Sequence, residues 1–589
     1  FHRERFGDIV VGNKIYSDKQ LVSLFDTSTP RWNSWLTKSD QYDRDKLQAD
    51  IDRLESFYRD RGFMDFAVTS TQVSLSPDRK WIYLTVNVDE GKVYRVKGYQ
   101  LQGDLIVPRT ELESLITFKP GDRYNRSEVR KSTDALRTRL ADEGYAQAQV
   151  NVVPNADKLS GEVSFDILVT PGIKTYVRQI GFTGNTKTYD RVLRRELRQQ
   201  EASLYSGSDV ARSEERLRRL PQVETLEQAI HPVPGTPDQV DLEYKITERS
   251  TSSIQGGVGY GQSSGALFNL EYNDNNFLGT GNSLGINFGK SSSEQRYGFD
   301  FTDPYFTADG VSINYAFDYS KTNYRKERLS DWAADTLDAT ITFGYPLTEY
   351  QSVYFGGGFR TLKINTGDNV ASEITDYLNK KGRRYKEGVV TLAWNKDTQD
   401  NTYLPTKGSL NKISGEITLP GSDDTYYKIG YRNRTYFPLN DDKSLILGLR
   451  GDIAYGGGYG KTDDLPFYRH YYAGGLTTVR GFEHSSLGPR YSNGDTSGGD
   501  FRTVGGVELM TPWKINEKSN NVRVGTFIDF GNVYSKPKDF DLGEFRYSGG
   551  LFVQWMSPLG PLNLSYAVPI KKKDGDEKEA FQFSFGMGF

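Results

Sequence analysis

The last nine residues, 581–589, read FQFSFGMGF and decide the fold of the second half of the chain. Large apolar residues and small or polar residues alternate without a break, and a period of two is typical of a β-strand with one apolar face. One face consists of Phe581, Phe583, Phe585, Met587 and Phe589, and the other of Gln582, Ser584, Gly586 and Gly588. Such a strand suits a sheet that presents one face to lipid.

The chain upstream of this strand alternates in the same way back to about residue 253. Gly is unevenly placed, with 14 residues in 1–251 and 46 in 252–589. Short turns at 348–350 and 558–560 contrast with long polar stretches at 321–333, 366–384 and 459–500. This pattern predicts an all-β antiparallel transmembrane barrel of sixteen strands over residues 251–589, with girdles of Tyr and Phe. A soluble sandwich or propeller is the alternative, but no blade repeat is visible.

The first strand of this barrel is predicted at residues 254–261, which read IQGGVGYG. Gly weakens a strand interior because it has no side chain to pack. The first and last strands must pair to close the barrel, so its weakest elements lie at the closure, which could open sideways. The candidate gate residues of the first strand are Ile254, Gly256, Gly257, Val258, Gly259 and Gly261. Those of the last strand are Phe581, Phe583, Phe585, Gly586, Gly588 and Phe589.

The first half of the chain is a threefold α+β repeat with the plan βααββ. The predicted turn glycines Gly12, Gly103 and Gly184 are 91 and 81 residues apart, and the helix-end glycines Gly62 and Gly144 are 82 apart. The predicted domains are 1–91, 92–173 and 174–250, followed by the barrel at 251–589. Short junctions between the repeats predict limited hinging. The repeats are either spacers or modules whose edge strands accept another chain; the residues alone do not decide between these.

Composition excludes several classes of function. The chain has no Cys, so it holds neither disulfides nor a Cys-ligated zinc, and its net charge of −3 gives no general attraction to nucleic acid. Mean hydropathy is −0.63, and no apolar run is long enough for a transmembrane helix. Four His occur, and none lies in a metal-binding or nucleophile motif. We therefore expect no enzymatic activity, no metal and no cofactor.

One motif stands out within the long loop 459–500. Val479-Arg480-Gly481-Phe482 precedes a new strand, and an Arg beside a Gly could fold into the barrel lumen and pair with carboxylates. Glu508 and Asp529 on later strands are the candidate partners. The residues alone favour the simpler interpretation, a solvated loop Arg.

Taken together, these features resemble the BamA family of outer-membrane assembly factors of Gram-negative bacteria. The resemblance rests on the Val479–Phe482 motif, the preceding repeats and the aromatic-ended barrel. Further matching stretches are NFLGTG at 276–281, DPYF at 303–306, IDFGNVY at 528–534 and GPL at 560–562. It implies that the repeats are POTRA domains in the periplasm, and that Arg480 folds inward onto Glu508 and Asp529. It also implies a lateral gate between the first and last strands, where a client strand pairs with the first.

The same resemblance implies the partners. These are unfolded outer-membrane protein clients, lipoproteins of the assembly complex on the POTRA domains, and the lipid bilayer, with no nucleic acid. The family normally has five POTRA domains and three are found here, matching its third to fifth. We therefore expect a truncated form without a signal segment. The alternative function is a POTRA-barrel translocation or secretion channel, similar to TamA or to two-partner secretion channels.

Overall fold

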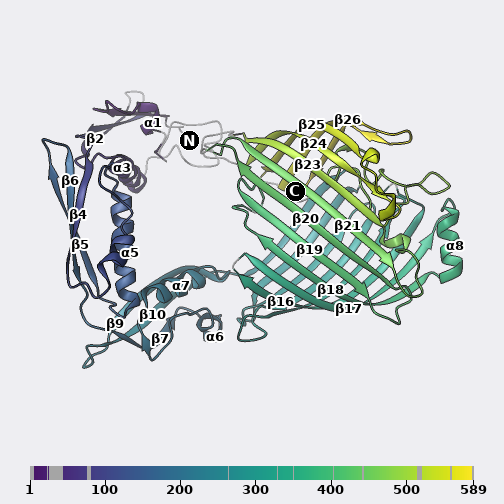
Figure 1. Ribbon diagram of the computed structural model, residues 1–589, viewed down its shortest axis with the longest axis horizontal. Coiled ribbons are helices and arrows are strands. Elements are labelled where there is room, and N and C mark those ends of the chain that lie inside the picture. Colours follow the sequence, from purple (N-terminus) through teal and green to yellow (C-terminus); the bar gives the residue numbers. More distant parts are fainter. Residues whose placement is uncertain are drawn as a thin grey trace. The chain divides into compact units, whose positions relative to one another are not determined.

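The computed structural model describes residues 5–22, 24–25, 44–75, 81–262, 264–327, 329–348, 350–401, 403–440, 443–513, 521–557 and 560–586. The chain forms two compact units (Figure 1). One comprises Phe1–Asn185 and Glu196–Thr247, and the other comprises Thr186–Arg195 and Glu248–Phe589.

The first unit contains three repeats, each with a small mixed sheet. The first repeat has β1 (Arg5–Val11), α1 (Asp18–Val22), α3 (Arg44–Arg59), β2 (Ala67–Leu75) and β3 (Trp81–Asp89). The second has β4 (Arg95–Gly103), α4 (Arg109–Ser114), α5 (Arg126–Asp142), β5 (Gln149–Asp157) and β6 (Glu162–Thr170). The third has β7 (Tyr176–Thr183), α6 (Asp190–Arg194), β8 (Ser203–Leu204), α7 (Gly207–Arg218), β9 (Val223–Pro232) and β10 (Gln239–Glu248). The last strand of each repeat lies in the sheet interior, parallel to the first and antiparallel to the one before it, as in the order β4-β6-β5.

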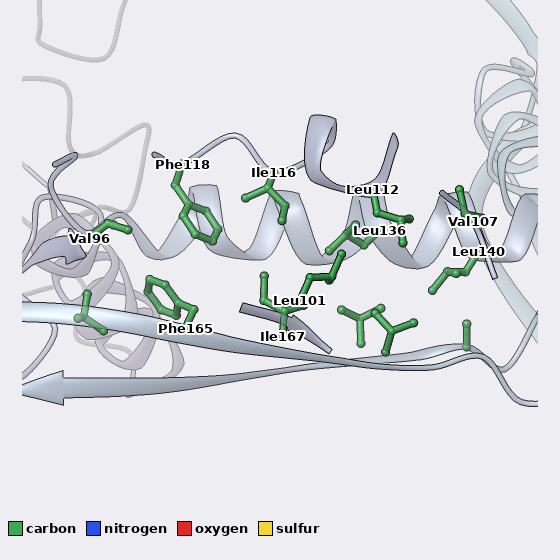
Figure 2. Packing of buried hydrophobic residues seen from close by; sticks show 14 of the residues in the cluster. Val96, Leu101, Val107, Leu112, Ile116, Phe118, Leu136, Leu140, Phe165 and Ile167 are labelled. Atoms are coloured by element: carbon green, nitrogen blue, oxygen red, sulfur yellow. The ribbon is translucent and has the colours of Figure 1, made fainter. Parts of the chain in front are cut away.

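Each repeat buries its own core between the long helix and the sheet, as Figure 2 shows for the second. Leu136 and Leu140 are one helical turn apart on α5 and are fully buried. They face Leu101 of β4 and Ile167 of β6, while Phe118 and Phe165 fill the other end. The apolar positions recur with periods of about 3.6 on the helix and 2 on the strands, which explains why this stretch folds as one layer of helix on one layer of sheet.

The two junctions between repeats are built in the same way. Asp60, directly after α3, accepts hydrogen bonds from the Ser127 backbone N–H (2.9 Å) and hydroxyl (2.8 Å) at the first turn of α5. Asp142, at the end of α5, accepts from the Ser208 N–H (2.7 Å) and the Ser206 hydroxyl (3.0 Å) at the first turn of α7. A carboxylate at a helix N-terminus satisfies free N–H groups and complements the helix dipole.

The second unit is a closed barrel of sixteen antiparallel strands, which confirms the predicted strand number. Its strands run tilted beside one another (Figure 1). They are β11 (Ser252–Gly261), β12 (Gly265–Phe277), β13 (Asn282–Lys290), β14 (Glu294–Asp303), β15 (Ser312–Asn323), β16 (Trp332–Thr348), β17 (Gln351–Thr366), β18 (Arg384–Asp397), β19 (Gly408–Thr418), β20 (Tyr426–Pro438), β21 (Ile446–Gly458), β23 (Phe501–Pro512), β24 (Val522–Tyr534), β25 (Arg546–Ser557), β26 (Gly560–Lys571) and β28 (Phe581–Phe585).

The loops at one end of the barrel carry additional structure. Helix α8 (Ser372–Lys381) lies between β17 and β18, and two 3-10 turns, η2 (Pro537–Asp539) and η3 (Leu542–Glu544), lie between β24 and β25. Residues 459–500, here called the inward loop, contain the 3-10 turn η1 (Phe467–Arg469) and the short strand β22 (Gly481–Phe482), which pairs with β27 (Lys578–Glu579). No helix within the described ranges is both long and apolar enough to cross a bilayer.

The last strand is shorter than the alternation predicted. The pattern continues to residue 589, but β28 ends at Phe585. Gly586 has a positive φ of 71° and its N–H bonds the Pro561 carbonyl (2.9 Å), so its backbone leaves the extended conformation. The predicted gate residues Gly588 and Phe589 lie outside the described residues.

Candidate functional site

The pairing between β11 and β28, here called the seam, is the shortest ladder in the described barrel. The ladder contains two residue pairs, Tyr260 with Phe585 and Gly261 with Ser584. On its other side β28 pairs with β26 over five residues, and β11 pairs with β12 over ten. Residues 252–259 of β11 therefore have a ladder partner on one side only in the described part of the chain. A strand edge without a ladder partner is a template for another strand.

The gate residues predicted on the first strand lie along this edge. Ile254 is 76% exposed and Val258 is 68% exposed. A Cβ added at Gly256 or Gly257 would meet no atom within 4 Å, whereas one at Gly259 would lie 2.5 Å from the Phe585 carbonyl oxygen. Gly259 is thus required by the close approach of β28. Gly256 and Gly257 leave this edge without side chains, and no contact requires a glycine at either position.

Aromatic rings cover part of the seam. Tyr260 on β11 stacks on Phe583 of β28 with ring centroids 5.5 Å apart and an interplanar angle of 8°. Phe583 also lies 5.9 Å from Phe581, which is half exposed. These contacts add to the short ladder, since stacked aromatic pairs contribute about 0.5–1.5 kcal/mol beyond their buried area.

Arg480 of the inward loop lies inside the barrel on the two predicted carboxylates. Its Nε and Nη2 donate to the Asp529 carboxylate (2.7 and 2.9 Å), and Nη2 also donates to Glu508 (2.6 Å). The Arg480 backbone N–H bonds Asp529 as well (3.1 Å), and the guanidinium lies 3.5 Å from the centre of the Phe527 ring. Although burial opposes the charge, the carboxylates of Asp529 and Glu508 raise the pKa of Arg480. Arg480 is 5% exposed, so the simpler interpretation of a solvated loop Arg is wrong.

Arg450 of β21 is a further member of this cluster that the sequence did not reveal. Its Nη2 lies 2.7 Å from Asp529 and also donates to the Thr478 carbonyl (2.6 Å). Asp529 is fully buried and serves two guanidinium groups. The two guanidinium groups compensate the cost of burying the Asp529 charge, and removing one partner would leave a buried charge uncompensated.

The motif also contacts the last strand, β28. The Gly481 N–H donates to Gln582 Oε1 (3.1 Å), and Gln582 Nε2 donates to the Phe482 carbonyl (2.8 Å). Val479 and Phe482 are fully buried in an apolar cluster with Leu487 and Val533. The inward loop is therefore bonded directly to β28 through Gln582, another residue that the sequence analysis did not single out.

A second cluster holds the other end of the inward loop. Arg469 Nη2 donates to Glu387 of β18 (3.2 Å). The Tyr468 hydroxyl shares its single proton between Glu387 (3.2 Å) and Asp424 (2.8 Å). Arg360 of β17 lies 3.5 Å from Glu387. Because its members are spread over two strands and two loops that are far apart in the sequence, no local motif predicts this cluster.

Between the seam and the loop lies a cavity of about 450 Å³. Gly261, Arg480, Glu508 and Gln582 contribute to its lining, so the cavity connects the seam with the Arg480 cluster. No group of three or more His, Asp or Glu side chains that could hold a metal ion occurs among the described residues.

Comparison with known proteins identifies the families to which the two units are similar. The Omp85 superfamily domain matches residues 276–589, and the POTRA family, described as a surface antigen variable number repeat, matches 5–91, 94–172 and 175–249. The outer membrane protein assembly factor BamA of Neisseria meningitidis is 34% identical over 98% of this chain and 77% of its own length. BamA of Nitratidesulfovibrio vulgaris is 25% identical, covering 98% and 72%.

A solved structure shows the same relationship. The crystal structure of BamA from Haemophilus ducreyi lacking POTRA domains 1–3 has a TM-score of 0.72 and 34% identity, covering 84% of this chain and all of that one. The fold and these matches define an outer-membrane β-barrel that carries periplasmic POTRA repeats. Within that class, the chain belongs to the BamA family of outer membrane protein assembly factors.

Proposed function

We propose that this chain assembles β-barrel proteins into the outer membrane by pairing a client strand with the open edge of β11. The observation that carries the proposal is the seam, where two residue pairs join β11 to β28 while ten join β11 to β12. Backbone hydrogen bonds would bind the client nearly regardless of its sequence. Unpaired backbone groups are costly in lipid, so each new pair lowers the free energy of the growing barrel.

This mechanism needs no chemical step by the chain itself. The free energy comes from client folding in the bilayer, and the chain acts as an assembly factor rather than an enzyme. The three POTRA repeats offer edge strands such as β5 and β9, and we propose that lipoproteins and unfolded clients bind the repeats. Two clusters hold the inward loop inside the barrel, which favours assembly over a steadily open secretion channel.

A disulfide across the seam tests this proposal. Gly261 and Ser584 are opposite each other, and opposite residues in an antiparallel ladder lie at distances that suit a disulfide. The chain has no native Cys, so Gly261→Cys with Ser584→Cys forms the only possible bond. We expect the oxidised variant to lose acceleration of client folding in liposomes, measured by protease protection, and to regain it on reduction.

The control is a disulfide between two barrel strands that are paired over many residues. Ser320 and Thr336 are opposite each other in the twelve-pair ladder of β15 and β16. The Ser320→Cys and Thr336→Cys disulfide should leave client folding unchanged. Full activity of the oxidised seam variant would contradict the gate.

A further inference from the structure

One side chain extends the seam beyond its two backbone pairs. Gln262 directly follows β11, and its Nε2 donates to the Phe581 carbonyl (3.1 Å) while its Oε1 accepts from the Phe583 N–H (3.2 Å). Both bonds go to backbone groups of β28. A primary amide is a side-chain group that supplies a donor and an acceptor at once, so Gln262 satisfies one carbonyl and one N–H of β28, as the backbone of a continued strand would.

The geometry of the first hairpin explains why a side chain has this role. Gly261 pairs with Ser584 of β28 on one side and with Gly265 of β12 on the other. The chain therefore turns toward β12 immediately after Gly261, and its backbone leaves β28 at that point. Phe581 and Phe583 continue past the turn, and the Gln262 side chain bridges the space to them.

From these contacts we infer that Gln262 is a positioning residue of the seam, a latch that holds β28 against the end of β11 until a client strand replaces it. The inference rests on the proposed gate and describes how that gate is regulated. A side chain can leave these bonds by rotating about its own χ angles, whereas a backbone pair parts only when the strand moves. When an incoming β-strand pairs with β11 and displaces β28, both Gln262 bonds to the Phe581 carbonyl and the Phe583 N–H break.

Hydrogen exchange of the full chain in lipid nanodiscs tests the latch without any client. Gln262→Met keeps the length of the side chain and removes both polar atoms, and Gln262→Ala removes the reach. Loss of two hydrogen bonds should accelerate exchange of the Phe583 amide about tenfold or more. The matched control is Gln351→Ala on β17, a strand six ladders from β11 in the barrel order, which should leave exchange at Phe583 as in the parent.

The outcomes separate the latch from the gate. Unchanged Phe583 exchange in both Gln262 variants would overturn the latch, whatever the seam disulfide does to client folding. Faster exchange supports the latch. Such variants should also close more slowly after the seam opens, so the Gly261→Cys and Ser584→Cys pair should oxidise more slowly in them than in the parent. If exchange accelerates but the oxidised seam variant still folds clients at full rate, Gln262 holds β28 against β11, but the gate fails and the role of the latch in client entry fails with it.

Discussion

The junctions between POTRA repeats and the barrel seam are both places where one piece of structure meets the next, yet they are joined differently. Each junction has a carboxylate, Asp60 or Asp142, bonded to the first turn of the following helix. Each also has a backbone bond, from Tyr94 N–H to Gly62 and from Thr175 N–H to Gly144, both 2.8 Å. The seam has two ladder pairs and a glutamine. The two POTRA junctions share this set of bonds, which suits a permanent connection. The seam is the shortest ladder of the described barrel, which suits a connection that opens.

Most other neighbouring strands of the barrel are paired over many more residues than the strands of the seam. The ladder of β16 and β17 contains sixteen residue pairs, so the seam is weak in an otherwise firmly paired wall. The inward loop supports the barrel from inside at two sites. Arg480 and Gln582 hold the end near β28, and Tyr468 and Arg469 hold the other end on Glu387.

The largest effect is expected from the support next to the seam. Asp529→Asn removes the carboxylate that Arg480 and Arg450 share, which leaves the buried Arg480 and the partly buried Arg450 with one nearby acid. Removing one partner of a buried ion pair costs about 3–5 kcal/mol. We expect a lower thermal unfolding temperature, faster proteolysis of the inward loop and slower client folding.

Asp318→Asn is the control for this prediction. Asp318 pairs with Arg296 at 2.8 Å, but their side chains are 33% and 55% exposed. Exposed pairs contribute about 0–1 kcal/mol, so the shift in unfolding temperature should be small. Equal shifts in the two variants would show that Asp529 does not support the loop.

A smaller effect is expected at the far end of the inward loop. Glu387→Gln keeps the shape of the buried side chain that accepts from Tyr426 (2.8 Å), Tyr468 and Arg469. Arg360 retains Asp338 and Glu416 as partners. The loss of charge-assisted bonds should cost about 1.5–3 kcal/mol, measured by thermal unfolding. Exchange of the Phe583 amide should not change, because this cluster does not contact β28. Faster exchange of the Phe583 amide in Glu387→Gln would remove the distinction between the two supports.

The sequence predicted the fold more completely than the site. Periods of two and 3.6 are local signals, and they predicted the βααββ repeats and the sixteen strands because side-chain burial follows them directly. The residues offered Glu508 and Asp529 as candidate partners of Arg480, but only the family resemblance favoured this pairing over a solvated Arg, since an acid on a lumen face has no local mark that tells a buried ion pair from a solvated one. Gln262 and Gln582 were missed for a related reason. Their roles depend on which strands meet across the seam, more than 300 residues apart in the case of Gln262 and Phe583.

The glycines of the first strand, β11, also show what the sequence could not predict. Gly256, Gly257 and Gly259 look alike in the sequence, and all three weaken the strand. The structure distinguishes Gly259, which β28 approaches too closely for a side chain, from the two that meet no neighbour. Composition predicted a weak strand, but only the register of β28 tells which glycine the closed seam requires.

The smallest effect is expected from substitutions that weaken a junction between repeats. Asp142→Ala removes the acceptor for the Ser208 N–H and the Ser206 hydroxyl, and Asp60→Ala does the same at Ser127. Loss of a cap costs about 1 kcal/mol, so amide exchange at Ser208 or Ser127 should accelerate by a similar factor in the two variants. Asp134→Ala on α5, an exposed residue paired with Arg137, should leave both amides unchanged. Because each junction bonds one carboxylate to a backbone N–H and a serine hydroxyl at the start of a helix, very different responses would mean that the two junctions are not equivalent. The contrast with the seam would then hold for one of them alone.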